Sequence, residues 1–288
     1  MYRVSIKPGL SVLCLSICIS AAGAASGQTP TCDKLSKEQR AIARELLDSS
    51  YPYDCCDETI SACLKKKPVC ALAYRLAENI CRRVADKQDK QEIKRGLSKR
   101  ARSMMSQKKV AIDLASTPAA GDPAAPVTAV VYACARCPYC SKLIPKLYES
   151  VENGALKKKV KLYFKPFPIR SHEYSKESGL AYVAAAKQGK FWEYMLLSYQ
   201  HFDEFCVLKQ ADWAELVGMD RAAFESAMAD PVTRTILVNS KKEGIVNKVD
   251  ATPTVFIDGR RFVGDMSAEE LTDVLEEAYD KAKGITFR

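Results

Sequence analysis

Apolar residues between positions 31 and 106 recur every three or four places, which is the spacing of a helix with one buried face. Ser36 followed by Gln39 has the pattern of a capping box. Four helices are predicted. The first carries Ile42, Leu46 and Leu47, and the second carries Ile60, Cys63 and Leu64 after an N-cap at Asp57. The third has Pro68 in its first turn and carries Leu72, Leu76, Ile80 and Val84, and the fourth begins near Asp89 and carries Ile93, Leu97, Ala101 and Met104. We therefore expect a small all-α domain over residues 31–106.

Strand-like runs appear only in residues 108–288, where they are interspersed with helical stretches. Residues 127–132 form an apolar, β-branched run, residues 160–164 alternate, and two short runs (254–258 and 261–263) flank Gly259 like a hairpin. A short edge strand is expected at 110–112, and helices at about 138–151, 175–188, 191–198, 210–217, 221–229, 231–242 and 267–282. This order predicts an α/β domain.

The N-terminal segment has the pattern of an export signal. Arg3 and Lys7 precede an apolar stretch at 10–19 that is too short to cross a bilayer, and small residues at 22–24 suit a cleavage site. We expect a signal peptide over residues 1–24, with an uncleaved anchor as the alternative. Its removal leaves ten of the 12 cysteines in a chain that enters an oxidising compartment, the periplasm.

Composition and charge add limits rather than a function. The chain has 288 residues, 47% of them hydrophobic and 27% charged, which excludes a disordered or fibrous protein. Its formal net charge is +9, and residues 31–106 hold 17 basic and 11 acidic residues. Because no nucleic-acid motif accompanies this excess, we expect no nucleic-acid partner and interpret it as a solvated basic face.

The all-α domain is rich in cysteine, which would stabilise a bundle too small for a large core. Structural disulfides are expected among Cys32, Cys55, Cys56, Cys63, Cys70 and Cys81, with the pairing left open. Adjacent residues rarely reach disulfide geometry, so Cys55 and Cys56 are not expected to bond to each other. The alternative is a copper or zinc thiolate cluster, although paired CxxC spacing and histidine are missing from this region.

The strongest chemical signal is Cys137-Pro138-Tyr139-Cys140, which follows a predicted strand and opens a predicted helix. Free N–H groups and the helix dipole at such a position stabilise a thiolate and lower its pKa. Arg136, immediately before, could add a cation that tunes the thiolate. Half a zinc site is the alternative, but no second cysteine pair has suitable spacing. The motif therefore predicts redox chemistry.

With this motif, the sequence resembles the DsbA-like branch of the thioredoxin superfamily. The resemblance also rests on Pro145, on Gln188 to Glu193 (QGKFWE), and on Ala251 to Gly259 (ATPTVFIDG), which is similar to the cis-proline strand of that family. It covers residues 108–288 and implies a thioredoxin fold with a DsbA-like helical insertion, preceded by the disulfide-rich all-α domain. It also places the Ala/Pro-rich segment 116–126 inside the domain.

The resemblance implies roles for individual residues and no cofactor. Cys137 would be the exposed nucleophile and Cys140 the buried resolving thiol, with Pro138 and Tyr139 tuning the potential. Pro253 would be a cis-proline facing the pair, and Thr252 would offer backbone groups to an extended substrate.

Two features depart from the family pattern. Val131 stands where many relatives carry a buried carboxylate, six residues before the nucleophile. Cys134 and Cys206 have no standard role, and we expect a structural disulfide between them; a second redox relay or two free thiols are the alternatives. His172 and His201 are expected to be surface residues.

These observations predict an exported thiol:disulfide oxidoreductase with no bound metal. Its expected partners are folding or misoxidised secreted proteins and a membrane redox partner, with a homodimer formed through the N-terminal domain. Whether it acts as an oxidase or as an isomerase or reductase stays open. The alternative from another class is a metal-binding or holdase protein that uses a thioredoxin fold as a scaffold.

Overall fold

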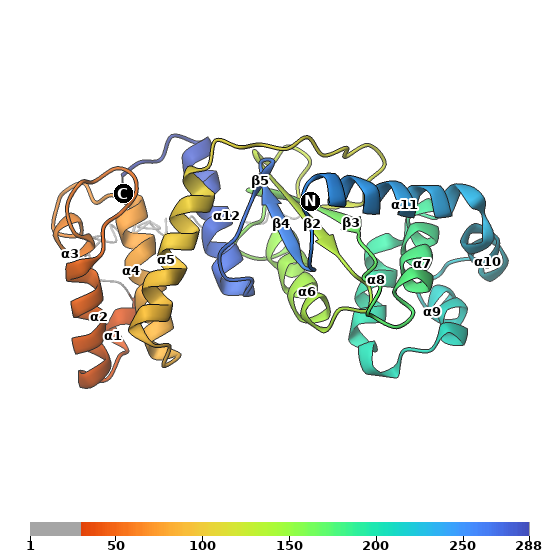
Figure 1. Cartoon of the computed structure of the whole chain (residues 1–288), viewed down its shortest axis with the longest axis horizontal. Helices are drawn as coiled ribbons and strands as arrows, with labels where there is room; N and C mark the ends of the chain where they lie inside the picture. The colour runs from red at the N-terminus through yellow and green to blue at the C-terminus, as the bar shows by residue number, and fades with distance from the viewer. Residues whose placement is uncertain (1–29, 288) are drawn as a thin grey trace, which may run out of the picture.

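The computed structural model describes residues 30–287, so the expected signal peptide lies outside the described residues. Figure 1 shows an elongated molecule with a helical region at one end, a sheet in the middle and a second group of helices at the other end. The last helix, α12 (Ala268–Ala282), lies between the helical region and the sheet. No helix among the described residues is long and apolar enough to cross a membrane.

The helical region confirms the all-α prediction, with helices α1 (Pro30–Asp33), α2 (Lys37–Ser49), α3 (Ile60–Cys63), α4 (Ala71–Ala85) and α5 (Lys90–Met105). Ser36 and Gln39 form the predicted capping box at the start of α2. Two expected caps were wrong. Thr59, rather than Asp57, accepts the hydrogen bond that opens α3. Pro68 was expected in the first turn of α4 but lies before this helix, and Cys70 caps it.

Three disulfides connect the six cysteines of this region: Cys32–Cys81, Cys55–Cys70 and Cys56–Cys63. They join α1 to α4 and fix the turn that contains α3. Cys63, Cys70 and Cys81 are buried in the same apolar cluster as Leu46, Ile60 and Ile80. The disulfides therefore reinforce a core built from short helices.

The sheet has the strand order β1-β3-β2-β4-β5. Its strands are β1 (Ala119–Ala120), β2 (Val127–Ala133), β3 (Val160–Pro166), β4 (Thr254–Ile257) and β5 (Arg260–Arg261). β2 and β3 are parallel, and the other neighbouring pairs are antiparallel. Asp258 and Gly259 both have positive φ, which suits the tight turn between β4 and β5. This arrangement confirms the thioredoxin-type α/β prediction.

Successive residues of β2 point to opposite faces of the sheet, as the pleat requires. Val127, Ala129 and Val131 join the main core, which includes α6 (Pro138–Glu152) and α12. Val130 and Tyr132 face the other side, where they pack with Phe167 and Phe256.

Residues 110–112 were expected to form an edge strand, and this prediction was wrong. The segment has no regular structure; Val110 donates a backbone hydrogen bond to Gly259, and Ile112 and Leu114 pack on the second sheet face. Their apolar pattern reflects this covering role. The edge strand is instead β1, within the Ala/Pro-rich segment.

The helical insertion between β3 and β4 contains α7 (Ser175–Lys187), α8 (Phe191–Gln200), α9 (Gln210–Leu216), α10 (Arg221–Ala229) and α11 (Pro231–Val246), with 3-10 turns at Phe202–Glu204 and Val207–Lys209. Four of the five helices match their predicted positions closely, while α11 extends four residues further than expected. Its C-terminal end leads directly into the loop before β4.

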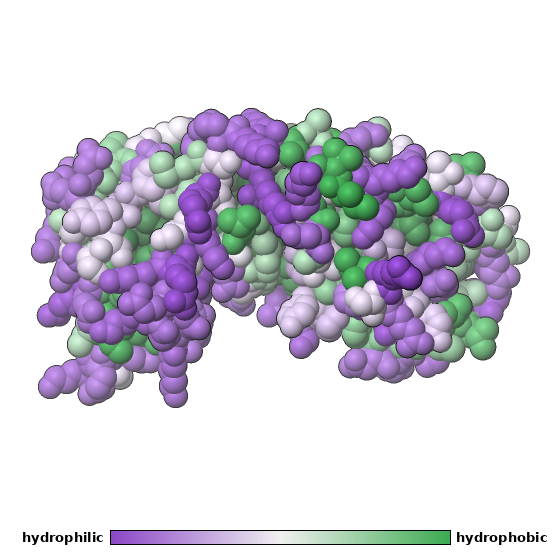
Figure 2. All heavy atoms as spheres, in the orientation of Figure 1, coloured by the Kyte–Doolittle hydropathy of each residue, from purple (hydrophilic) through white to green (hydrophobic). Residues whose placement is uncertain are grey.

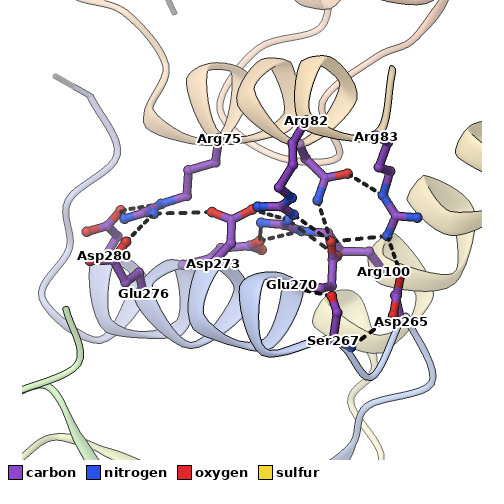
Figure 3. A network of polar contacts seen from close by, with 12 residues as sticks. Arg75, Arg82, Arg83, Arg100, Asp265, Ser267, Glu270, Asp273, Glu276 and Asp280 are labelled. Carbon is purple, nitrogen blue, oxygen red and sulfur yellow. Dashed lines mark hydrogen bonds and ion pairs between the residues drawn. The ribbon is translucent and has the colours of Figure 1, made fainter. Parts of the chain in front are cut away.

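Arginines of α4 and α5 face acidic residues of α12 (Figure 3). Arg75 contacts Asp273, Glu276 and Asp280 at 2.7–3.4 Å. Arg100, with no exposed side-chain surface, contacts Asp273 at 2.5 Å and Glu277 at 2.6 Å. The pairing partners of these arginines are all acids of the α/β region.

Glu270, at the centre of this interface, has a side chain that is 1% exposed. It accepts hydrogen bonds from Asn79, Arg82 and Arg83. The expectation of a solvated basic face was therefore wrong for these arginines, since part of the positive charge of the helical region serves an internal interface. The domain boundary at about residue 107 stays a prediction.

Candidate active site

The CPYC motif lies at the junction between β2 and α6. The backbone N–H of Cys137 donates to the carbonyl of Cys134 at 3.1 Å, which closes a turn at the end of the strand. Cys137 is then the N-cap residue of α6, and Pro138 is its first residue. Proline suits this position because its missing N–H would have no partner there. The first free N–H groups of the helix consequently surround the Cys137 thiol.

The loop before β4 packs against this thiol. The Cys137 thiol donates a hydrogen bond to the carbonyl oxygen of Thr252 at 3.3 Å. The Thr252–Pro253 peptide bond is cis, as the resemblance implied. The structure therefore brings together two segments that are 115 positions apart in the sequence.

Cys137 differs from its expected exposure. It was expected to be exposed, but it is 1% exposed, because the Thr252 loop covers its sulfur; Cys140 is fully buried, as expected. Tyr139 is 74% exposed and Pro138 is also exposed, so these two residues form the solvent-accessible part of the motif.

The two thiols of the motif have opposite acidities. The pKa of Cys137 is lowered to about 5, first by the hydrogen bond from the Cys140 thiol, then by Thr252 and by the backbone N–H groups of Cys140 and Tyr139. Burial works against this shift and is outweighed. The pKa of Cys140 is raised far above its usual value by burial and by the neighbouring Cys137 sulfur. Above about pH 5 the reduced pair thus holds one thiolate, at Cys137, and one proton, at Cys140. The hydrogen bond from Cys137 to the Thr252 carbonyl belongs to the protonated form of Cys137.

The side chain of Thr252 adds to this arrangement. Its hydroxyl is buried and has no conventional hydrogen-bond partner in the structure. It nevertheless lies close enough to both sulfurs to lower the pKa of each. A buried hydroxyl with a free donor is suited to a thiolate, since burial strengthens its interaction with charge.

Arg136 was expected to tune the thiolate, but its guanidinium points away from Cys137. It lies over the rings of Phe202 and Phe205, 4.4 and 4.3 Å from their centres, and donates to the Phe202 carbonyl at 2.7 Å. Burial lowers the pKa of Arg136. This residue joins the helical insertion to the active-site turn, and the groups that lower the pKa of Cys137 are those of α6 and Thr252.

Cys134 and Cys206 were expected to form a disulfide, but both are free thiols in the structure. Cys134 is buried, and its sulfur contacts Nδ1 of His172 at 3.4 Å. Cys206 is partly exposed and lies near Tyr174, whose pKa it helps to raise. The two thiols are thus oriented toward different neighbours.

His172 and the Phe202–Phe205 pair are features of the site that the sequence did not indicate. His172 was expected at the surface; it is half-buried because it packs on Cys134, and His201 is half-buried beside Glu204. Val131, six residues before Cys137, is buried in the same apolar cluster as Cys140. Among residues 30–287, no three His, Cys, Asp or Glu side chains gather as metal ligands.

Comparison with known proteins agrees with this geometry. A family profile described as Thioredoxin matches residues 113–277, more than half of the chain. The Na(+)/H(+) antiporter NhaA 3 of Salinispora tropica is 31% identical over 160 residues, which are 55% of this chain and 24% of the antiporter. The chain thus spans about a quarter of the length of the curated relatives it matches.

Two solved structures share the fold of the α/β region. Oxidised BdbD of Bacillus subtilis has a TM-score of 0.52 at 17% identity and covers 60% of this chain and 97% of its own. The thiol-disulfide exchange protein alpha-DsbA2 of Wolbachia pipientis has a TM-score of 0.50 at 19% identity and covers 66% and 98%. With its matched profile and its strand–CPYC–helix site, this chain belongs to the thioredoxin family and has a DsbA-like thioredoxin fold.

Proposed function

We propose that the protein is an exported thiol:disulfide oxidoreductase that works as an oxidase of secreted proteins. The observation that carries the proposal is the low pKa of Cys137, about 5, beside the protonated and buried Cys140. A stabilised thiolate favours the reduced form of the pair and so makes its disulfide a strong oxidant.

The reaction begins with the Cys137–Cys140 disulfide. A substrate thiolate attacks the sulfur of Cys137, the bond between Cys137 and Cys140 breaks, and Cys140 leaves and takes up a proton. A second substrate thiolate then attacks the substrate sulfur of this mixed disulfide, and Cys137 leaves as a thiolate. The substrate gains one disulfide and loses two electrons, which the enzyme pair receives. A thiol with a low pKa is the better leaving group, so Cys137 speeds the second step.

The loop at Thr252 and Pro253 would hold the substrate. In the reduced structure the Thr252 carbonyl accepts a hydrogen bond from the Cys137 thiol. The backbone of Thr252 therefore lies where an extended substrate segment bound at Cys137 could form hydrogen bonds with it. The nearly complete burial of Cys137 implies that the loop or Tyr139 shifts when a substrate binds. A periplasmic location and a membrane partner that reoxidises the pair are part of this proposal.

An isomerase or reductase is the second candidate, because the helical region adds surface beside the sheet domain. Figure 2 shows an indentation between the two regions on the lower side of the molecule. Such an enzyme would need a pair that stays reduced, whereas the stabilised Cys137 thiolate favours donation of the disulfide. A metal-binding scaffold is less well supported, since disulfides occupy the six thiols of the helical region.

The equilibrium of the pair with glutathione tests the proposal. We expect a reduction potential near that of DsbA, ~−120 mV, for the wild-type protein and no exchange in Cys137→Ser. A value near that of thioredoxin, ~−270 mV, would support the reductase or isomerase instead. A pair that does not equilibrate with glutathione would refute exchange chemistry altogether.

A further inference from the structure

Five cations without acidic partners among the described residues lie on α5 and in the segment that follows it. Arg95, Lys99 and Arg102 lie on α5, and Lys108 and Lys109 follow shortly after its end. All five are exposed, and none of them forms an ion pair, although 14 other lysines and arginines within residues 30–287 do so. We call these five residues the basic ridge.

The spacing of the ridge concentrates its charge. Arg95 and Lys99 are four positions apart and Lys99 and Arg102 are three apart, so neighbouring side chains on one helix face carry the same charge. Such pairs repel each other and destabilise a helix slightly. The acid of this helix, Glu92, is in its first turn, where it complements the helix dipole. Arg100, on the opposite side of α5, is by contrast buried among the acids of α12.

We propose that the basic ridge docks the protein on an anionic phospholipid surface. A row of exposed cations is complementary in charge to a layer of phosphate headgroups, and such a layer requires no shaped pocket on the protein. Met105, 54% exposed at the end of α5, lies among the ridge residues and adds an apolar contact. Figure 2 shows the surface over the helical region as mostly hydrophilic, which suits contact with headgroups rather than insertion into the acyl layer.

This docking is independent of the redox pair, since none of the ridge residues contacts the active-site cysteines. It goes beyond the proposed function by giving the helical region a role of its own. Each cation near an anionic membrane strengthens binding about fivefold, the equivalent of ~1 kcal/mol. Removal of three charges is then expected to weaken binding about a hundredfold at low salt.

Sedimentation of the mature protein with lipid vesicles tests the proposal. We expect binding to vesicles of equal parts phosphatidylglycerol and phosphatidylcholine, weaker binding as salt is added, and none to phosphatidylcholine alone. The triple variant R95Q/K99Q/R102Q is expected to lose binding about a hundredfold while it keeps the wild-type redox potential. The control K157Q/K176Q/K242Q, which removes three exposed lysines elsewhere on the described surface that form no ion pair, is expected to bind like the wild type.

Several outcomes would overturn the proposal. Equal loss in the control variant would show that net charge, not the ridge, governs binding. Equal binding to neutral vesicles would point to apolar insertion. Failure to bind anionic vesicles, combined with ridge-dependent binding to soluble polyglutamate, would assign the ridge to an acidic polypeptide. Complete loss of vesicle binding in a few millimolar inorganic phosphate, at constant ionic strength, would show a site for the free anion.

Discussion

Glu270 on α12 and Arg83 on α4 form a buried ion pair across the two regions, with Oε2 of the carboxylate 3.1 Å from Nη2 of the guanidinium. The same oxygen also lies 3.2 Å from Arg82. Such a pair is costly to break, because the partner that remains is a buried charge without its counter-ion. The other side of α12 belongs to the core that contains Cys140, so this interface connects the helical region to the layer that supports the active site.

Loss of the Glu270 carboxylate is expected to destabilise the whole chain. Glu270→Gln leaves three nearby arginines short of negative charge, and we expect the free energy of unfolding to fall by about 3 to 5 kcal/mol in urea titrations of the oxidised protein. Glu269→Gln is the control. The side chain of Glu269 is 56% exposed, and its ion pair with Lys146 is long, at 3.9 Å. Because exposed ion pairs contribute little, removal of this carboxylate is expected to lower the free energy of unfolding by less than ~1 kcal/mol. Similar costs for the two variants would contradict the role of Glu270.

The Thr252 hydroxyl is expected to lower the pKa of Cys137. Thr252→Val removes this donor while it keeps the shape of the side chain, so the thiolate loses one source of stabilisation. Absorbance at 240 nm should show the Cys137 transition near pH 5 in the wild type and at higher pH in the variant. Arg136→Gln should leave the transition in place, because its guanidinium contacts Phe202 and Phe205.

The stability of the reduced protein is expected to depend on pH through Cys137. Its pKa is lower in the folded protein than in the unfolded chain, so the thiolate contributes stability in full above about pH 9. This contribution declines below that pH and is lost as the pH falls through about 5. Urea unfolding at a series of pH values should show this decline in the reduced protein. If Cys137→Ser followed the same profile, another group would be responsible.

The three disulfides are expected to stabilise the folded protein by different amounts, according to the lengths of the loops that they close. Cys32–Cys81 spans 49 positions and Cys56–Cys63 spans 7. In the chain-entropy account, removal of the first pair by alanine should cost about 4 kcal/mol and removal of the second about 2 kcal/mol. Thermal or urea unfolding of the two double variants would measure the difference. The reverse order would mean that local packing of the cysteines outweighs the loop term.

The order of the elements was predictable because it depends on local patterns. An apolar, β-branched run identified β2, period-two alternation identified β3, and helical spacing identified α4 and α5, while the CPYC motif stood at a strand–helix junction. The turn at Asp258 and Gly259 was likewise predictable, because these two residue types readily adopt the positive φ angles that the turn requires.

The remaining features depend on partners that are distant in sequence. Cys137 is buried by a loop 115 positions away, and Arg136 turns toward Phe202, 66 positions away. The pairing of Arg75 with Asp280 spans 205 positions. One signal for this interface was nevertheless present: Glu270, Asp273, Glu277 and Asp280 recur at three- and four-residue steps, as residues of one helix face do. An acidic face of this kind requires a basic counterpart, which the arginines of the helical region supply.

The position of α12 at the end of the chain also sets an order of events during synthesis. The ribosome completes Arg75 to Arg100 roughly 10 to 40 s before it reaches Asp280, at ~5–20 residues per second. Throughout that interval Arg75, Arg82, Arg83 and Arg100 lack their acidic partners on α12. The last helix to be made therefore completes both the interface with the helical region and the core beside the sheet, and a nascent chain that stops before it would leave the first-made region without these counter-charges.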